Sequence, residues 1–147
     1  MEKTHVDTSA CLLKQEKLSK LFAHLPSSEA KYEKIMEMGK NLPPLSEACR
    51  TEKHLVPGCQ SIVYLRAYLG ADGHSYFEIH SEALISSGLA ALLLYVYNGE
   101  PPEVILTCPP TFIQELGLLQ SLSPGRSNGL ASMFQAMRKE ALLLLTN

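Results

Sequence analysis

The feature that most constrains this chain is a pair of alternating segments near its middle. Residues 61–69 place Val63 and Leu65 on one face of a predicted strand, and residues 70–73 then supply a hairpin-length turn. Residues 74–80 predict a second strand, with Phe77 and Ile79 facing the core. Two strands alone are only marginally stable in water, so helices must cover this ribbon or a third strand must join it.

Helical patterns flank the predicted hairpin on both sides. Apolar spacing and helix-stop residues predict helices at about 12–25, 29–38, 81–97 and 128–145, with shorter helical turns after the proline pairs at 101–102 and 109–110. Ser27 should cap the second of these helices, and Gly39 should end it. In the last helix the side chains expected to point inward are those of Met133, Met137, Leu142 and Leu145. Strands grouped in the middle with helices on either side predict an α+β fold rather than an α/β fold.

Length and charge limit the function classes. The length of 147 residues predicts a single domain, which we place at residues 11–147. We expect residues 1–10 to form a loose tail before it. The net charge is −2 without a basic block, so nothing indicates a nucleic-acid partner. The longest apolar run, residues 89–96, is too short to cross a bilayer. The first residues are polar and lack an apolar signal core, so we expect a cytoplasmic protein without a membrane partner.

One cysteine occupies a position suited to chemistry. Cys59 follows Pro57 and Gly58, a pair typical of a turn, and stands where a loop enters the first predicted strand. The preceding residues include His54 and other polar side chains, so the loop should reach the surface. A thiol held at a loop tip is accessible for reaction, whereas most cysteines are small buried hydrophobes. Both interpretations of Cys59, a reactive thiol and an inert one, fit this local pattern.

The other cysteines define the alternatives. Cys11, Cys49 and Cys108 form no CxxC or CxxH pair with one another or with Cys59, so we expect no metal site and no disulfide. A cysteine hydrolase or acyl transferase would use Cys59 with His54 as the base, and it would also need an orienting residue and an oxyanion site. An iron–sulfur scaffold or other metal-binding protein would need Cys49 and Cys108 to converge on Cys59.

Arg126 is the second candidate functional residue. It stands before the last predicted helix, where a cation opposes the helix dipole, so helix stability does not explain it. One interpretation is a solvated loop charge. The other is a cation that binds a carboxylate or supports a thiolate elsewhere in the fold.

Several separated blocks of this sequence resemble the SufE family of sulfur-acceptor proteins, which work with cysteine desulfurases in iron–sulfur cluster assembly. The blocks are YEKIMEMGKNLPPL at 32–45, VPGCQSIVY at 56–64, GLAALL at 88–93, ELGL at 115–118 and LSPGRSNGL at 122–130. They occur in the family's order over roughly two thirds of the chain. The resemblance implies a compact α+β domain with a small antiparallel sheet covered by helices, similar to the SufE/IscU-like fold.

The resemblance also implies a function. Cys59 matches the family's sulfur-accepting cysteine, so the chain should take persulfide sulfur from a pyridoxal-phosphate-dependent cysteine desulfurase, stimulate that enzyme, and pass the sulfur to an iron–sulfur cluster scaffold. Such a protein is a covalent sulfur carrier rather than a stand-alone enzyme, and it needs no cofactor or metal of its own. The supporting or partner-binding residues are then expected to be Gly58, Gln60, Ser61, His54, Glu82 and Arg126.

Three positions depart from the family pattern. The family often has Asp-Ser-Asp where this chain has His80, Ser81 and Glu82, which removes one acidic residue and keeps the second. Ser87 stands where a basic residue is common, and Tyr64 stands where a tryptophan is common. These departures leave the thiol chemistry unchanged and bear on partner choice and loop behaviour.

Overall fold

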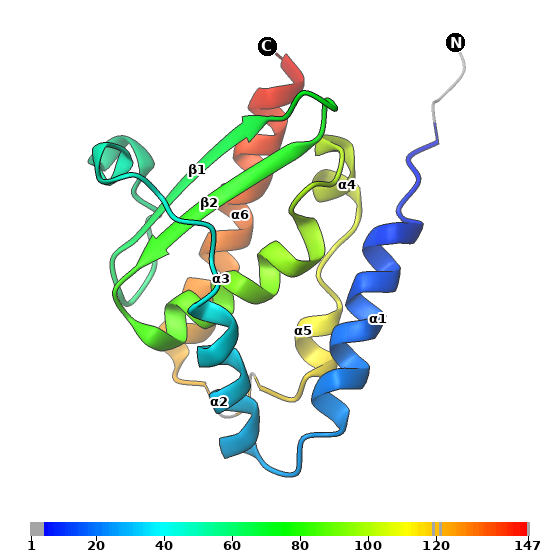
Figure 1. The fold of residues 1–147 in the computed structure, drawn as a ribbon, viewed down its shortest axis with the longest axis vertical. Coiled ribbons are helices and arrows are strands. Elements are labelled where there is room, and N and C mark those ends of the chain that lie inside the picture. The colour runs from blue at the N-terminus through cyan, green and yellow to red at the C-terminus, as the bar shows by residue number, and fades with distance from the viewer. Residues whose placement is uncertain (1–4, 119, 121, 147) are drawn as a thin grey trace.

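The computed structural model describes residues 5–118, 120 and 122–146. Its helices are α1 (Ser9–Ala23), α2 (Ser28–Gly39), α3 (Leu84–Tyr97), α4 (Pro102–Thr107), α5 (Phe112–Glu115) and α6 (Pro124–Thr146). Its strands are β1 (Val63–Leu69) and β2 (Ser75–Ser81), and two 3-10 turns, η1 (Glu47–Cys49) and η2 (Glu52–His54), precede β1. The predicted α+β class is therefore confirmed (Figure 1).

The hairpin forms as its alternation predicts. β1 and β2 pair antiparallel, with Val63 opposite Ser81 at one end and Leu69 opposite Ser75 at the other. Among the described residues no third strand joins this sheet, and only an isolated bridge between Leu55 and Tyr64 extends it. Figure 1 shows α3 and α6 behind the hairpin, so helices cover its apolar face and stabilise it.

Helix α3 forms the centre of the core. Most of its side chains are buried, including Leu89, Leu92 and Leu93, because α2, α1, α6 and β2 all pack against it. α2 crosses α3 where two glycines meet, since a Cβ on Gly39 would lie 2.7 Å from the Gly88 amide nitrogen. Gly39 does end α2, as expected, but the following Lys40 is in the right-handed helical region and the glycine has no positive φ. The need for Gly39 is therefore close packing, not a left-handed cap.

Helix α1 begins earlier than the predicted tail allows. The Asp7 carboxylate accepts a hydrogen bond from the Ser9 amide at 3.0 Å, and α1 starts at Ser9, so residues 9 and 10 are helical. The first four residues of that predicted tail lie outside the described residues. The buried Gln15 ties α1 to the segment between α4 and α5: its amide donates to the Pro109 carbonyl and its oxygen accepts from the Phe112 amide, each at 3.1 Å.

Helix α6 differs from the sequence expectation in where it starts and in the orientation of its last side chains. It begins at Pro124, four residues before the predicted start, because Ser123 accepts from the Arg126 and Ser127 amides at 3.1 and 3.0 Å through its carbonyl. A proline at the first helical position suits this arrangement. Met133 and Met137 are buried as predicted. The predicted inward orientation of Leu142 and Leu145 is wrong, since both are exposed and the end of α6 extends beyond the core in Figure 1.

Candidate functional site

The Cys59 loop is closed at its base by the start of the hairpin. The Val56 amide donates to the Val63 carbonyl at 2.8 Å, and Leu55 bridges to Tyr64 in the adjoining position. Val56 itself is buried, so residues 57–62 form a short tip on a fixed base. Gly58 has φ +83°, and a Cβ there would lie 2.5 Å from the Ser132 hydroxyl oxygen, so both its conformation and its contact with α6 require glycine.

Cys59 lies half-buried against helix α6. Its thiol donates to the Gly129 carbonyl across 3.7 Å, and a Cβ on Gly129 would lie at ordinary contact distance from Cys59. Burial raises the pKa of the Cys59 thiol, and within the described part of the chain no cation offsets that effect. At neutral pH the resting group is therefore mainly the protonated thiol, and its thiolate form is disfavoured.

Gln60 fastens the loop tip to the start of α6. Its side-chain oxygen accepts from the Ser123 hydroxyl at 3.2 Å, and the missing side chain of Gly125 gives it space. The Ser123 hydroxyl also accepts from the Arg126 amide at 3.3 Å, so the same residue caps α6 and holds the cysteine loop. The first turns of α6 thus support three consecutive loop residues. Ser132 lies against Gly58, Gly129 against Cys59 and Gly125 against Gln60.

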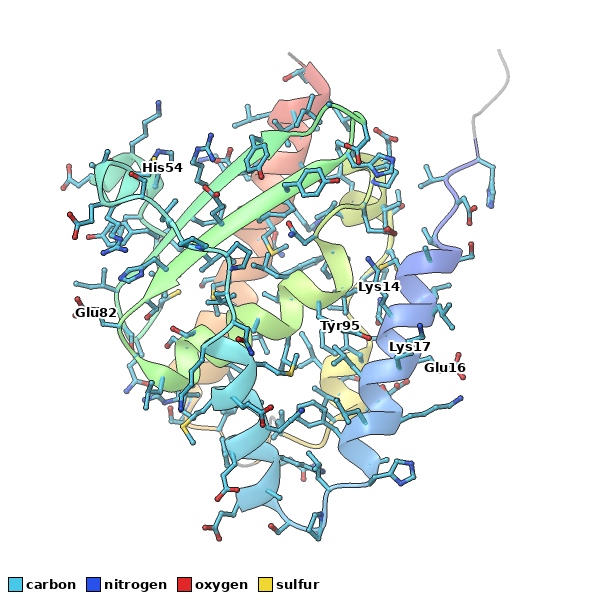
Figure 2. All side chains as sticks on the ribbon, in the orientation of Figure 1. Lys14, Glu16, Lys17, His54, Glu82 and Tyr95 are labelled. Carbon is cyan, nitrogen blue, oxygen red and sulfur yellow. The ribbon has the colours of Figure 1, made fainter. Side chains whose placement is uncertain are left out.

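The other predicted site residues lie around the loop without touching the thiol. His54 is in η2 and contributes to a groove with Val56 and Ser132, but no hydrogen bond joins it to Cys59 in the described structure. Ser61 and Glu82 border a different hollow, on the outer side of the hairpin. In Figure 2 His54 and Glu82 are both at the left edge of the molecule, on separate elements. The predicted His54–Cys59 pairing for a hydrolase is therefore not formed.

Arg126 is in the first turn of α6, close to the anchored Gln60. Its side chain is half-buried, and its Nη1 atom is buried without a hydrogen-bond partner among the described residues. Burial of an unpaired guanidinium nitrogen costs free energy, so stability does not explain this arrangement. Arg126 also does not lower the pKa of Cys59 in this state.

The remaining cysteines lie elsewhere. Cys11 and Cys108 are buried together, and both accept from the Gln15 amide, at 3.7 and 3.4 Å. Burial first, and then contact with Cys108, raises the pKa of Cys11 to about 12. Cys49 is partly exposed in η1. Over the described ranges of the chain no group of three or more His, Cys, Asp or Glu side chains could hold a metal ion.

The local sequence did not indicate the residues that build the back of this site. Ser123, Gly125, Gly129 and Ser132 hold Gly58, Cys59 and Gln60, yet they are more than sixty positions away in the chain. The available signal was the cluster of glycine and serine at the start of a predicted helix, where such residues lower helix propensity. At Gly125 the loop requires small size, because a Cβ there would clash with the side chain of Gln60.

Comparisons with known proteins place this chain among similar sequences. Residues 16–141 match the family described as "SufE: Fe-S metabolism associated domain". The chain is 42% identical over 131 residues to SufE-like protein 1, chloroplastic/mitochondrial, of Arabidopsis thaliana, which covers 89% of this chain and only 35% of that longer protein. It is 39% identical over 124 residues to an uncharacterized SufE-like protein of Rhizobium etli, covering 82% of this chain and 84% of the relative.

A solved structure gives the same fold. The solution structure of a hypothetical protein from Thermus thermophilus superposes with a TM-score of 0.76 at 26% identity, covering 91% of this chain and 97% of that one.

None of the helices in the described part of the chain has the length and apolar character needed to cross a membrane.

Proposed function

This chain belongs to the SufE family of proteins associated with Fe–S metabolism, and on that premise we propose that it is a sulfur acceptor whose acceptor atom is the Cys59 thiol. Its partner is a pyridoxal-phosphate-dependent cysteine desulfurase, which holds sulfur from free cysteine as a persulfide on its own cysteine. The sulfur then passes from Cys59 to an iron–sulfur cluster scaffold. A cytoplasmic location stays a prediction.

The transfer is a displacement at sulfur. The Cys59 thiolate attacks the outer sulfur of the enzyme's persulfide, a new S–S bond forms, and the S–S bond within that persulfide breaks. The desulfurase cysteine leaves as a thiolate, and the proton lost from Cys59 can neutralise it, so no external oxidant or reductant is consumed. The rate depends on thiolate fraction, leaving-group acidity and access. Release of the desulfurase's cysteine also explains why this protein would stimulate its partner.

One observation carries the proposal: a half-buried thiol at the tip of a short loop, with no base beside it. Cys59 contacts a backbone carbonyl rather than a histidine, and burial holds its pKa above the ordinary cysteine value. A persulfide exchange needs access and a suitable partner, whereas hydrolysis of an acyl group needs a base and an oxyanion site. The arrangement supports an acceptor that becomes reactive when a partner docks.

The two rival functions lack their required groups in the described structure. The hydrolase needs His54 at Cys59, and that hydrogen bond does not form. The scaffold needs several metal-ligating side chains together, and Cys108 meets Cys11 rather than Cys59.

We also propose that the loop tip at residues 57–62 moves during transfer. Side-chain contacts to α6 hold the tip through Gln60 and Cys59, and these are weak or partly exposed bonds. The base is held by a backbone hydrogen bond and by the buried Val56. Opening therefore requires only that the tip leave α6. The closed loop shelters the persulfide on Cys59, and the open loop presents it to a partner.

The direct test is intact mass spectrometry after incubation with the desulfurase and cysteine. The wild-type protein should gain the mass of one sulfur atom, and Cys59→Ser should gain none. Cys49→Ser is the matched control, because Cys49 is also partly exposed and should be dispensable. Sulfur uptake by Cys59→Ser at the wild-type level would contradict the assignment.

A further inference from the structure

A second polar hollow lies on the outer side of the hairpin, beside the Cys59 loop. It has a volume of about 550 Å³, and its polar lining residues are Arg50, Ser61, Tyr64, His80 and Glu82. Arg50 comes from the segment between η1 and η2, whereas Tyr64 and His80 are directly opposite each other on β1 and β2. Three segments that are distant in sequence thus bring polar side chains to one place. We refer to it as the Arg50 hollow.

The side chains of the Arg50 hollow have unused hydrogen-bonding capacity. Arg50 donates through Nη2 to the Leu45 carbonyl at 3.1 Å, but its buried Nε has no partner in the described structure. The side chains of Tyr64 and His80 make no hydrogen bond with another described residue. Arg50 makes a single hydrogen bond in the described structure, so its guanidinium keeps donor groups for a ligand in the hollow, which gives the hollow the character of a binding site.

The rest of the same sheet face shows the contrast. The next cross-strand pair, Arg66 and Glu78, is an ion pair at 2.8 Å, and the pair beyond it, Tyr68 and Tyr76, stacks with ring centroids 5.7 Å apart. In each of these pairs the two side chains contact each other. The Tyr64–His80 pair instead lines a hollow together with Arg50.

The chemistry of the hollow favours a carboxylate. The arginine and the hydroxyl groups of Ser61 and Tyr64 can all donate hydrogen bonds, and a guanidinium pairs well with a carboxylate. Glu82, the acidic member, is exposed and remains in contact with water.

The rim indicates that the carboxylate belongs to a protein. Ile62 is 66% exposed beside the hollow, and Leu84, just after Ala83 of the lining, is 59% exposed. Arginine and tyrosine surrounded by exposed apolar side chains are typical of protein–protein contact sites. Ser61 is only two residues from Cys59, so a partner seated here would lie next to the acceptor loop.

We propose that the Arg50 hollow receives an acidic side chain of the cysteine desulfurase and so docks that enzyme beside Cys59. The proposal rests on the proposed function, because it takes the desulfurase as the partner. It adds the place and the chemistry of the contact. The acidic side chain binds Arg50, and the partner covers Ile62 and Leu84.

The first experiment compares the dissociation constants of three proteins for the desulfurase from the same genome. Arg50→Gln should weaken binding at least tenfold and reduce its dependence on salt concentration. Arg66→Gln is the control, an arginine on the same face that is already paired with Glu78, and its dissociation constant should stay within twofold of the wild type. Equal weakening by both variants, or none by Arg50→Gln, would overturn the proposal.

A second variant covers the case in which loss of the Leu45 contact unfolds the segment around Arg50. Arg50→Lys keeps the charge, and its new amine can be joined to a neighbouring carboxylate by a carbodiimide. Mass spectrometry of the crosslinked complex should find position 50 bonded to an Asp or Glu of the desulfurase. The Arg66→Lys complex should give no such crosslink at position 66. A complex that transfers sulfur normally but never crosslinks through position 50 refutes the docking proposal alone, whereas wild-type protein that takes up no sulfur refutes the proposed function and this inference with it.

Discussion

At the scale of single residues, Cys59 rests mainly as the protonated thiol. Burial raises its pKa, and the Gly129 carbonyl accepts from the protonated thiol. A thiol in this state is slow to react with small oxidants as well as with electrophiles, because the thiolate is the nucleophile. In the proposed transfer, docking must therefore uncover Cys59 or change its surroundings.

The acidity of Cys59 can be measured by alkylation. Because its pKa is raised, less thiolate is present at neutral pH, so the rate of reaction with iodoacetamide should rise with pH to a midpoint above the ordinary cysteine value of about 8.5. The measurement uses Cys49→Ser, so that Cys59 is the reactive thiol followed by mass spectrometry. Cys11 and Cys108 are buried and should react only after unfolding. A midpoint at or below that of free cysteine would show that burial does not control this thiol.

Arg126 should matter for the partner more than for the fold. Its buried Nη1 has no partner in the described structure, so Arg126→Ala removes a desolvation cost and should not lower the free energy of unfolding. Loss of an interface arginine typically costs about 1 kcal/mol or more of binding, so the desulfurase titration should shift to higher protein concentration. Melting temperature and titration are measured on the same sample, with Arg138→Ala on the same helix as the control. An unchanged titration midpoint and maximal rate would make Arg126 an ordinary solvated charge.

At the scale of secondary-structure elements, glycine determines how closely helices and loops approach. Gly88 lets α2 pack against α3, since a Cβ there would lie 2.5 Å from the Ile35 carbonyl oxygen. Gly129 has space for a side chain, because a Cβ there would lie 3.7 Å or more from Cys59, which is an ordinary contact. The same substitution at these two helical glycines should therefore have opposite effects on stability.

Gly88→Ala should destabilise the protein. Overpacking costs about 1–3 kcal/mol, and the gain in helix propensity recovers about 1 kcal/mol of that at most. Gly129→Ala, the matched control, gains the propensity without the clash and should be neutral or slightly stabilising. Urea unfolding of both variants supplies the comparison. Equal stability of Gly88→Ala and the wild type would mean that α2 and α3 can separate at no cost.

At the scale of the whole molecule, one apolar core connects the helices and the hairpin. The buried Tyr97 shows this well: its hydroxyl donates to the Cys108 carbonyl at 2.6 Å, and its ring centroid lies 5.1 Å from that of Phe134 on α6. The four cysteines are free thiols, and the described residues include no metal-binding group of three or more ligands. We expect burial of these apolar side chains to be the main source of stability.

Thermal unfolding should thus be insensitive to chelators and to reductants. Melting curves with and without a chelator should coincide, because the described residues include no group of three or more side chains that could hold a metal ion. Curves with and without a reductant should also coincide, because no disulfide is present in the folded protein. A large drop in melting temperature with the chelator would reveal a structural metal and contradict this expectation.

Local patterns in the sequence determined the hairpin, most of the helices and the place of Cys59 at a loop tip. The alternation of Val63 and Leu65 and the turn before β2 act over a few neighbouring residues, so they can be interpreted without the fold. The family blocks predicted the α+β class for the same reason that they predicted Cys59: they are contiguous stretches of chain. The inward orientation predicted for Leu142 and Leu145 was wrong because amphipathic spacing alone does not reveal where the core stops.

Only the tertiary structure decided what surrounds Cys59. The contacts of Cys59 with Gly129 and of Gln60 with Ser123 join positions 70 and 63 residues apart, and the Arg50 hollow combines three separate segments. Such contacts depend on how α6 and the hairpin pack, which no local propensity records. The sequence therefore singled out Cys59 as the candidate thiol, whereas packing decided that it rests protonated against α6 and that Arg126 keeps a buried Nη1 without a partner among the described residues.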